Sequence, residues 1–411
     1  MRSIKFRFQL HDALFFLLMV VSIYFTRNVL CSVLMMAFFG YTIVRQLSRR
    51  EKMKFPFFCV GFLVFILYGA LNIYLKNVIN VDVAQTMVVS LLLNMMMIYA
   101  VIQYIVMQNN IFKMLRLTEL SILTVALLVI LLSLGTLTQG RLATGTEVNA
   151  NALSMLCVYA FSMTLYFRKI QAISSTSAWI RMAIYLLSIL LTGSRKGLVM
   201  IVLVIVVVNL AGGKRKIIRS ILIGAVATVA LYVAIMNIDF LYNIIGQRVE
   251  NLIILLTEGS TTEGSLSSRQ ALIEIGIDYI KEKPWTGYGY DCFKLISGTG
   301  GGGKVDSSSY GYYSHNNYIE LLFGGGVIGF VLYYLPMLYL LIQLIKNLKK
   351  NRCMAYLLAI LVSKLAIEYA YVSYYDRVDA YLLAIIMGCV LVCKNTADSS
   401  DDALPDLQKR R

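Results

Sequence analysis

Long apolar stretches recur along almost the whole of this 411-residue sequence, and they limit what the chain can fold into more than any other feature. A helix of about 20 apolar residues crosses the hydrocarbon core of a bilayer, and several of these stretches are somewhat shorter. Twelve can be placed, near residues 12–26, 28–44, 56–75, 84–107, 118–137, 151–167, 180–193, 197–211, 217–236, 317–345, 354–373 and 379–393. The sequence therefore predicts an all-α, polytopic helical bundle with about 12 transmembrane helices.

The composition agrees with this prediction. Hydrophobic residues make up 59% of the chain, charged residues only 15%, and the mean hydropathy is +0.72. A soluble domain of ordinary composition carries about 25% charged residues. Because the apolar residues come in blocks, they indicate lipid contact rather than a larger soluble core.

The net charge of +16 could suggest a nucleic-acid-binding protein, but the positions of the charges exclude this interpretation. If the N-terminus is cytoplasmic, the segments on the inner side carry 25 of the 38 basic residues, whereas the short outer loops carry one or two each. Cytoplasmic loops of membrane proteins are enriched in Lys and Arg in this way. We therefore expect both termini in the cytoplasm and the basic excess at the anionic inner leaflet.

The spans divide the chain into four parts. Residues 1–236 would form an N-terminal bundle of about nine spans, and residues 237–316 a large extracytoplasmic loop between the ninth and tenth spans. Residues 317–394 would form a C-terminal bundle of about three spans, and residues 395–411 a disordered cytoplasmic tail. Within the loop, residues 266–283 have the periodicity of an amphipathic helix.

A turn with two cations joins the seventh and eighth spans on the outer side, where cations are disfavoured. It reads Thr192-Gly193-Ser194-Arg195-Lys196-Gly197. Arg presents a planar fork of donors suited to phosphate oxygens, so Arg195 indicates an anionic ligand. The alternative is a tight loop whose cations reach the outer headgroups. Arg141, flanked by Gly140 and Gly145, is a weaker candidate of the same kind.

His315 lies at the outer boundary of the membrane, followed by Asn316 and Asn317 and then by a span. Its imidazole titrates near neutral pH and could accept a proton from an attacking hydroxyl group as a general base. The alternative is a partly exposed interfacial residue. Arg269, at the start of the amphipathic helix, is uninformative when taken alone.

Three other patterns have structural explanations. Gly298–Lys304 has the spacing of a phosphate-binding loop, but Val305 replaces the Ser or Thr that would hold Mg²⁺. The glycines at 324–326 favour close packing of the tenth span. Lys364 and Glu368 lie four residues apart in the eleventh span, which favours a mutual ion pair over a pair that lines a substrate path. No cluster of residues has metal-ligand spacing, so no metal site is predicted.

In combination, several motifs resemble the O-antigen ligase and O-antigen polymerase family. They are Thr192-Gly193-Ser194-Arg195, then Ser268-Arg269, then Pro284-Trp285-Thr286-Gly287-Tyr288-Gly289, and finally His315-Asn316-Asn317-Tyr318 followed by Gly326-Val327-Ile328-Gly329. They occur in the expected order over residues ~140–345. The family's Asn-Pro-Asn signature is represented here by Asn149-Ala150-Asn151.

This resemblance implies a metal-independent, inverting glycosyltransferase of the bacterial cytoplasmic membrane that needs no cofactor. Its donor would be a glycan linked to undecaprenyl pyrophosphate, and its active site would be extracytoplasmic. The implied catalytic residues are Arg195 and Arg269, which would hold the pyrophosphate, and His315, which would deprotonate the acceptor hydroxyl. The implied substrate-binding residues are Lys196, Arg141, Asn151 and Asn316.

We expect a polymerase that joins lipid-linked repeat units into a capsule, exopolysaccharide or O-antigen chain. Its partners would be the acceptor glycan, the bilayer, and a flippase and a chain-length regulator of the same pathway. One alternative is a ligase that moves finished glycan to a lipid or protein acceptor. A more distant alternative is a twelve-helix transporter, which would predict two related halves. The single large loop argues against such halves.

Overall fold

The computed structural model describes residues 8–25, 28–50, 53–135, 141–211, 217–258, 264–297 and 311–398. The described part is helical and contains no strand, so the prediction of an all-α fold is confirmed. The tail after residue 398 and the glycine tract at 298–304 lie outside the described residues.

Each of the twelve predicted spans corresponds to one helix. They are α1 (Leu10–Tyr24), α2 (Val29–Ser48), α3 (Phe57–Tyr74), α4 (Val81–Gln108), α5 (Ile111–Ser133), α6 (Ala150–Lys169), α7 (Ser175–Leu191), α8 (Arg195–Leu210), α9 (Ile217–Asn237), α14 (Asn317–Lys346), α15 (Cys353–Ile367) and α16 (Arg377–Asp398). Seven helices in the described part are long and apolar enough to cross a membrane, namely α2 to α6, α14 and α15 with the turn that follows it. The protein is therefore a polytopic helical membrane protein, and the count of twelve spans stays a prediction.

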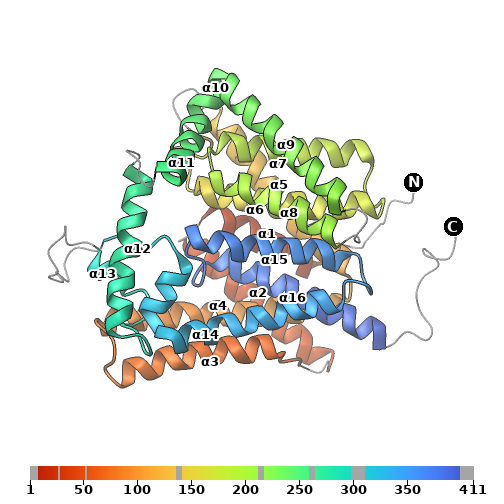
Figure 1. Cartoon of the computed structure of the whole chain (residues 1–411). Coiled ribbons are helices and arrows are strands. Elements are labelled where there is room, and N and C mark those ends of the chain that lie inside the picture. Colours follow the sequence, from red (N-terminus) through yellow and green to blue (C-terminus); the bar gives the residue numbers. More distant parts are fainter. Residues whose placement is uncertain are drawn as a thin grey trace.

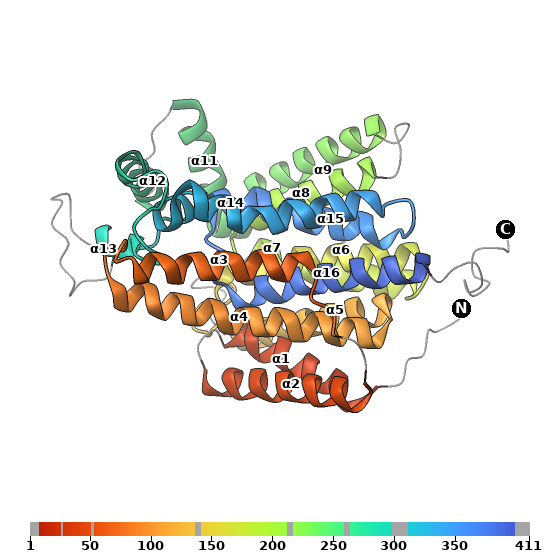
Figure 2. The same cartoon turned by 90° about the horizontal axis from the view of Figure 1, so that it is seen from below.

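The segment between α9 and α14 has helices of its own. They are α10 (Asp239–Leu241), a π-helical turn (Tyr242–Gly246), α11 (Gln247–Glu258), α12 (Gly264–Glu282) and α13 (Phe293–Ile296). The expected amphipathic helix is α12. It contacts α14, and its Leu272 is buried in a small apolar cluster with Phe293 and Phe323. Figures 1 and 2 show α12 and α13 at one end of the bundle, and the C-terminal end of α16 at the opposite end.

Helix α16 lies inside the bundle and packs mainly against α4. Every residue from 379 to 390 is buried, and Figure 2 shows the helix enclosed by its neighbours. A helix that is apolar on all sides suits such a central place. Asp379, in the first turn of α16, is an acidic residue in this otherwise apolar surface.

The loop that follows α12 packs against the glycines in the first half of α14. Backbone N–H groups of Tyr288 and Gly289 donate to the carbonyls of Phe323 and Gly324, both at 2.8 Å. At Gly326 the helix is interrupted (φ 62°, ψ −167°), and a Cβ atom there would lie 2.3 Å from the Trp285 carbonyl. The glycines thus allow close packing, as expected, but against this loop rather than a neighbouring helix. This contact fixes the loop beside the start of α14.

Lys364 and Glu368 form the expected mutual ion pair, and both are buried. Ser373 bonds to both partners, and the Tyr334 hydroxyl donates to Glu368 at 2.8 Å. Since each charge has a partner and further hydrogen bonds, the pair is satisfied inside the bundle.

Candidate active site

One residue of the Thr192–Arg195 turn, Gly193, has a backbone conformation that only glycine adopts easily. Gly193 ends α7 in the left-handed region (φ 60°), as glycine commonly does after a helix. A Cβ atom at Gly193 would lie 2.7 Å from the Ile244 carbonyl and 2.9 Å from the Arg141 side chain. The turn is therefore pressed between the π-helical turn and Arg141, and α8 starts directly after it with Arg195.

Helix α8 also approaches α6 closely, because Gly197 faces Ser154 of α6. A Cβ atom at Gly197 would lie 1.9 Å from the Ser154 hydroxyl oxygen. The first turn of α6 is fixed by Asn149, whose side chain accepts from the N–H groups of Asn151 and Ala152 at 2.9 and 3.2 Å. The N-terminal turns of α6 and α8 thus lie side by side, and helix N-termini carry partial positive charge.

Helix α11 contributes a cation that the sequence analysis missed. The guanidinium of Arg195 donates to the backbone carbonyl of Arg248 at 2.7 Å, so the start of α8 and the start of α11 are joined. Arg248 lies in the segment expected on the outer side, where cations are disfavoured. Its position on this side is the one sequence signal that could have identified Arg248, and no motif surrounds the residue.

Five cationic side chains line one cavity of about 170 Å³ at this junction. Its lining residues are Arg141, Asn151, Gly193, Arg195, Lys196, Arg248 and Arg269. None of these described lining residues is acidic, so the wall of the cavity is uniformly positive. We call it the cationic cavity. Such a site suits a polyanion, and Arg is the side chain best suited to phosphate oxygens.

A larger and more open cavity of about 690 Å³ adjoins the cationic cavity and shares Arg195, Lys196 and Arg269 with it. His315 lines it, together with Glu274 of α12. Much of its remaining wall is apolar and comes from α8, α11, α12 and the end of α15, namely Val199, Leu252, Ile273, Ala366, Ile367 and Ala370. We call it the histidine cavity. It places an imidazole next to the cations, with apolar surface around both.

His315 is held in a left-handed backbone conformation (φ 56°) just before α14. On one side, the N–H of Ser314 donates to the buried Glu320 carboxylate at 2.8 Å. On the other side, Asn316 caps α14 by accepting from Tyr318 and Ile319 at 3.0 and 3.2 Å. The ring of Tyr313 lies 4.1 Å from the imidazole, centroid to centroid. The strained residue is therefore fixed from both sides, which is a common property of functional positions.

Asn316 lines neither cavity, and the role that the structure shows for it is the capping of α14. Arg141 and Asn151 line the cationic cavity but not the histidine cavity. Lys196 lines both, is 9% exposed, and places its ammonium 5.3 Å from the centre of the Tyr371 ring. The fold thus brings together all of the candidate residues except Asn316, although they come from five separate segments.

Burial, and then the charges of Arg269 and Lys196, lower the pKa of the His315 imidazole from 6.5 to about 4. The lowered pKa keeps the ring neutral at pH 7, so it can accept a proton.

This lowered pKa predicts the acid side of the pH profile. Since the free protein loses the neutral imidazole only as the pH falls through about 4, we expect kcat/KM for transfer to stay constant down to about pH 5. Arg269→Gln removes one of the charges that lower the pKa, so the acid limb of its residual activity should move up towards 6.5. The check is kcat/KM against pH for both proteins. An acid limb near pH 6.5 in the unchanged protein would contradict the placement of His315.

The fold and this site define a class of protein: a polytopic helical membrane protein with a cationic cavity beside a neutral histidine at one end of its bundle. A comparison with protein-family models matches residues 180–334 to the family described as O-antigen ligase. The resemblance indicated by the motifs is confirmed over this region, which includes Arg195, Lys196, Arg248, Arg269 and His315. A search of curated proteins finds no match.

Proposed function

We propose that this protein is an inverting glycosyltransferase that moves a glycan from a polyprenyl pyrophosphate to a hydroxyl group of an acceptor sugar. The observation that carries this proposal is the convergence of five cations on one cavity that adjoins His315. The match to the O-antigen ligase family supports the same class of reaction and lipid-linked glycans as substrates.

The donor's pyrophosphate fits the cationic cavity. As the bond between the anomeric carbon and the phosphate oxygen breaks, negative charge grows on the leaving pyrophosphate. Arg195, Arg248 and Arg269 are placed to stabilise this charge, and fixed donors act most strongly where charge develops in the transition state. In this proposal the arginines supply the charge stabilisation that Mg²⁺ supplies in many phosphate sites, so the transfer step needs no metal. The apolar wall of the histidine cavity can receive the first isoprene units of the lipid.

In this proposal the acceptor sugar binds in the histidine cavity. Its hydroxyl oxygen attacks the anomeric carbon on the face opposite to the leaving pyrophosphate, and the new glycosidic bond therefore has inverted configuration. His315 takes the hydroxyl proton, and its lowered pKa keeps it neutral until that step. The products are the elongated glycan, the polyprenyl pyrophosphate and one proton, which leaves from the imidazolium.

We further propose that the acceptor is another lipid-linked repeat unit, so that the protein is a polymerase of a capsule, exopolysaccharide or O-antigen chain. The site would face the outer side of the bacterial cytoplasmic membrane. The positive-inside distribution supports this orientation, because it assigns the segment from α10 to α13 to the outside. Arg195 and His315 lie at the end of the bundle formed with that segment.

Glycan gels from a deletion strain test the polymerase assignment. A strain without the protein should lose long glycan chains and retain single repeat units, because units would still be made but not joined. Expression of the unchanged protein should restore the ladder. If instead the strain accumulates long chains that remain attached to the polyprenyl carrier, the protein is a ligase. Normal ladders on the correct acceptor would exclude both.

A further inference from the structure

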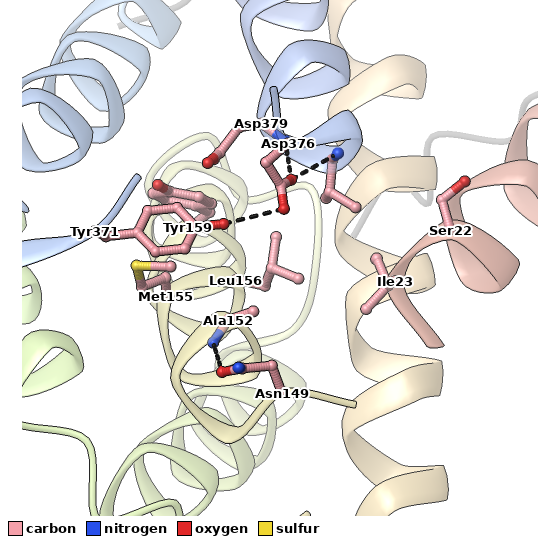
Figure 3. Close-up of a pocket in the computed structure, with 11 residues that line it drawn as sticks. Ser22, Ile23, Asn149, Ala152, Met155, Leu156, Tyr159, Tyr371, Asp376 and Asp379 are labelled. Atoms are coloured by element: carbon pink, nitrogen blue, oxygen red, sulfur yellow. Dashed lines mark hydrogen bonds between the residues drawn. The ribbon is translucent and has the colours of Figure 1, made fainter. Parts of the chain in front are cut away.

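A second polar centre lies behind the cationic cavity, on the other side of the first turn of α6. It surrounds a cavity of about 40 Å³ between α1, α6, α16 and the segment before α16. Figure 3 shows the carboxylates of Asp376 and Asp379 beside the rings of Tyr159 and Tyr371, with Asn149 and Ser22 further along the wall. We call it the aspartate cavity.

The carboxylate of Asp376 is fully engaged. One oxygen accepts from the N–H groups of Val378 and Asp379 at 2.9 and 3.0 Å, and the other accepts from the Tyr371 hydroxyl at 3.0 Å. Figure 3 draws these three bonds as dashed lines. Asp376 thus holds the start of α16 and the Tyr371 side chain in place, and its negative charge stays at the cavity.

Asp379 is different, because it is only 6% exposed and its Oδ2 atom is buried with no hydrogen-bond partner in the described part of the chain. A buried carboxylate oxygen without a partner is costly, and most such atoms in native proteins bind something. Two cations of the neighbouring segments bond to other groups. Lys364 bonds to Glu368 and Ser373, and the guanidinium of Arg377 donates to the Cys31 sulfur at 3.7 Å.

We propose that the aspartate cavity binds a monovalent, hard cation, for which Na⁺ is the probe, with Asp379 as its charged ligand and Asp376 beside it. The oxygen atoms of carboxylates, amide carbonyls and waters are the ligands that hard cations prefer. A volume of about 40 Å³ has room for one such ion and one or two waters, since a water needs about 10–15 Å³. This inference concerns a site separate from the proposed glycan transfer, and the ion takes no part in that step.

The small volume of the cavity and its single unpaired carboxylate oxygen favour a monovalent ion over a divalent one. Asp379 supplies the one carboxylate oxygen that lacks a partner here, and Ca²⁺ takes six to eight oxygen ligands. Within the described ranges, no three His, Cys, Asp or Glu side chains gather so that they could hold a metal ion. Mg²⁺ keeps several waters, for which the cavity is too small.

The aspartate cavity is connected to the cationic cavity by two features. The Lys196 ammonium lies over the face of the Tyr371 ring, and the Tyr371 hydroxyl donates to Asp376. The first turn of α6 lines both cavities, with Asn151 on one side and Asn149 and Ala152 on the other. A bound cation would therefore stabilise the wall that supports Lys196.

Thermal unfolding of the purified full chain in detergent tests this inference. At constant ionic strength, replacing choline chloride with NaCl should raise Tm by about 2–4 °C, and the rise should saturate, as for one site that is filled only in the folded state. Asp379→Asn should remove this response and leave Tm in choline at or above that of the unchanged protein, because it removes a buried charge. Asp278→Asn, at a carboxylate that is 75% exposed, is the matched control and should keep the response.

A second measurement does not depend on any variant. Equilibrium dialysis with radioactive Na⁺ should show one saturable site per chain in the unchanged protein. Equal Tm values in both salts together with no bound Na⁺ would overturn the proposal, and a Tm that follows pH but not Na⁺ would mean that a proton occupies Asp379. A full Na⁺ response in Asp379→Asn would place the ion elsewhere, and saturation by Ca²⁺ at far lower concentration would overturn the assignment to a monovalent ion.

Discussion

Replacing Arg195 with glutamine is expected to slow glycan transfer by about 10²–10³-fold, the usual loss when one fixed donor to a developing anion is removed. Arg195 lines both cavities, and its guanidinium is fixed by the Arg248 carbonyl at 2.7 Å. The variant therefore loses both charge and a pre-aligned donor where the pyrophosphate would lie. The measurement is the rate of chain extension in membranes supplied with the lipid-linked donor, together with donor binding, which should also weaken.

The matched control for Arg195→Gln is Lys281→Gln. Lys281 is a cation of α12, but it is 70% exposed, pairs with Asp278 on the helix surface, and lines neither cavity. This control should retain full activity and normal accumulation in the membrane. Equal activities of the two variants would show that the cationic cavity does not hold the donor.

Replacing His315 with asparagine is expected to lower turnover by about 10²–10⁴-fold, the range that general-base catalysis contributes. Asparagine is preferable to alanine here because it tolerates the left-handed backbone at φ 56° while lacking a basic nitrogen. Since the cationic cavity does not include His315, donor binding should remain close to normal. Turnover and donor affinity, measured on the same preparation, check this expectation.

The contrast between these two variants separates the catalytic step from donor binding. Arg195→Gln should weaken both donor binding and turnover, whereas His315→Asn should affect turnover alone. A control beside the histidine is Tyr313→Phe, which keeps the ring that contacts the imidazole and should remain active. Normal polymer ladders from His315→Asn would remove the histidine from the mechanism.

Much of the site could be predicted because its residues break the local pattern of the sequence. Arg195 and Lys196 interrupt apolar stretches on the side that disfavours cations, and His315 precedes a span with two asparagines after it. Arg248 is expected on the same side, but no motif surrounds it and a single Arg in a long polar loop is ordinary. Its place in the cavity depends on the packing of α11 against the start of α8.

Asn316 illustrates the opposite case. The motif suggested substrate binding, and this role stays a prediction. In the structure the Asn316 side chain caps α14, and the residue lines neither cavity. Asparagine before a helix satisfies exposed backbone N–H groups, and a motif cannot distinguish this role from ligand binding. The glycines of α14 were correctly expected to allow close packing, but their partner, the loop at Trp285, is far away in sequence.

By itself, the sequence determined that this is a polytopic helical membrane protein, where its helices lie, and which cations and which histidine are unusual. These properties depend on local hydrophobicity and on charge counted segment by segment, so they can be read along the chain. Only the tertiary structure decided that Arg141, Arg195, Arg248 and Arg269 meet at one cavity. It also decided that one carboxylate oxygen of Asp379 is buried with no hydrogen-bond partner among the described residues. The physical reason is that burial and charge clustering depend on contacts between helices distant in sequence, which the local pattern does not encode.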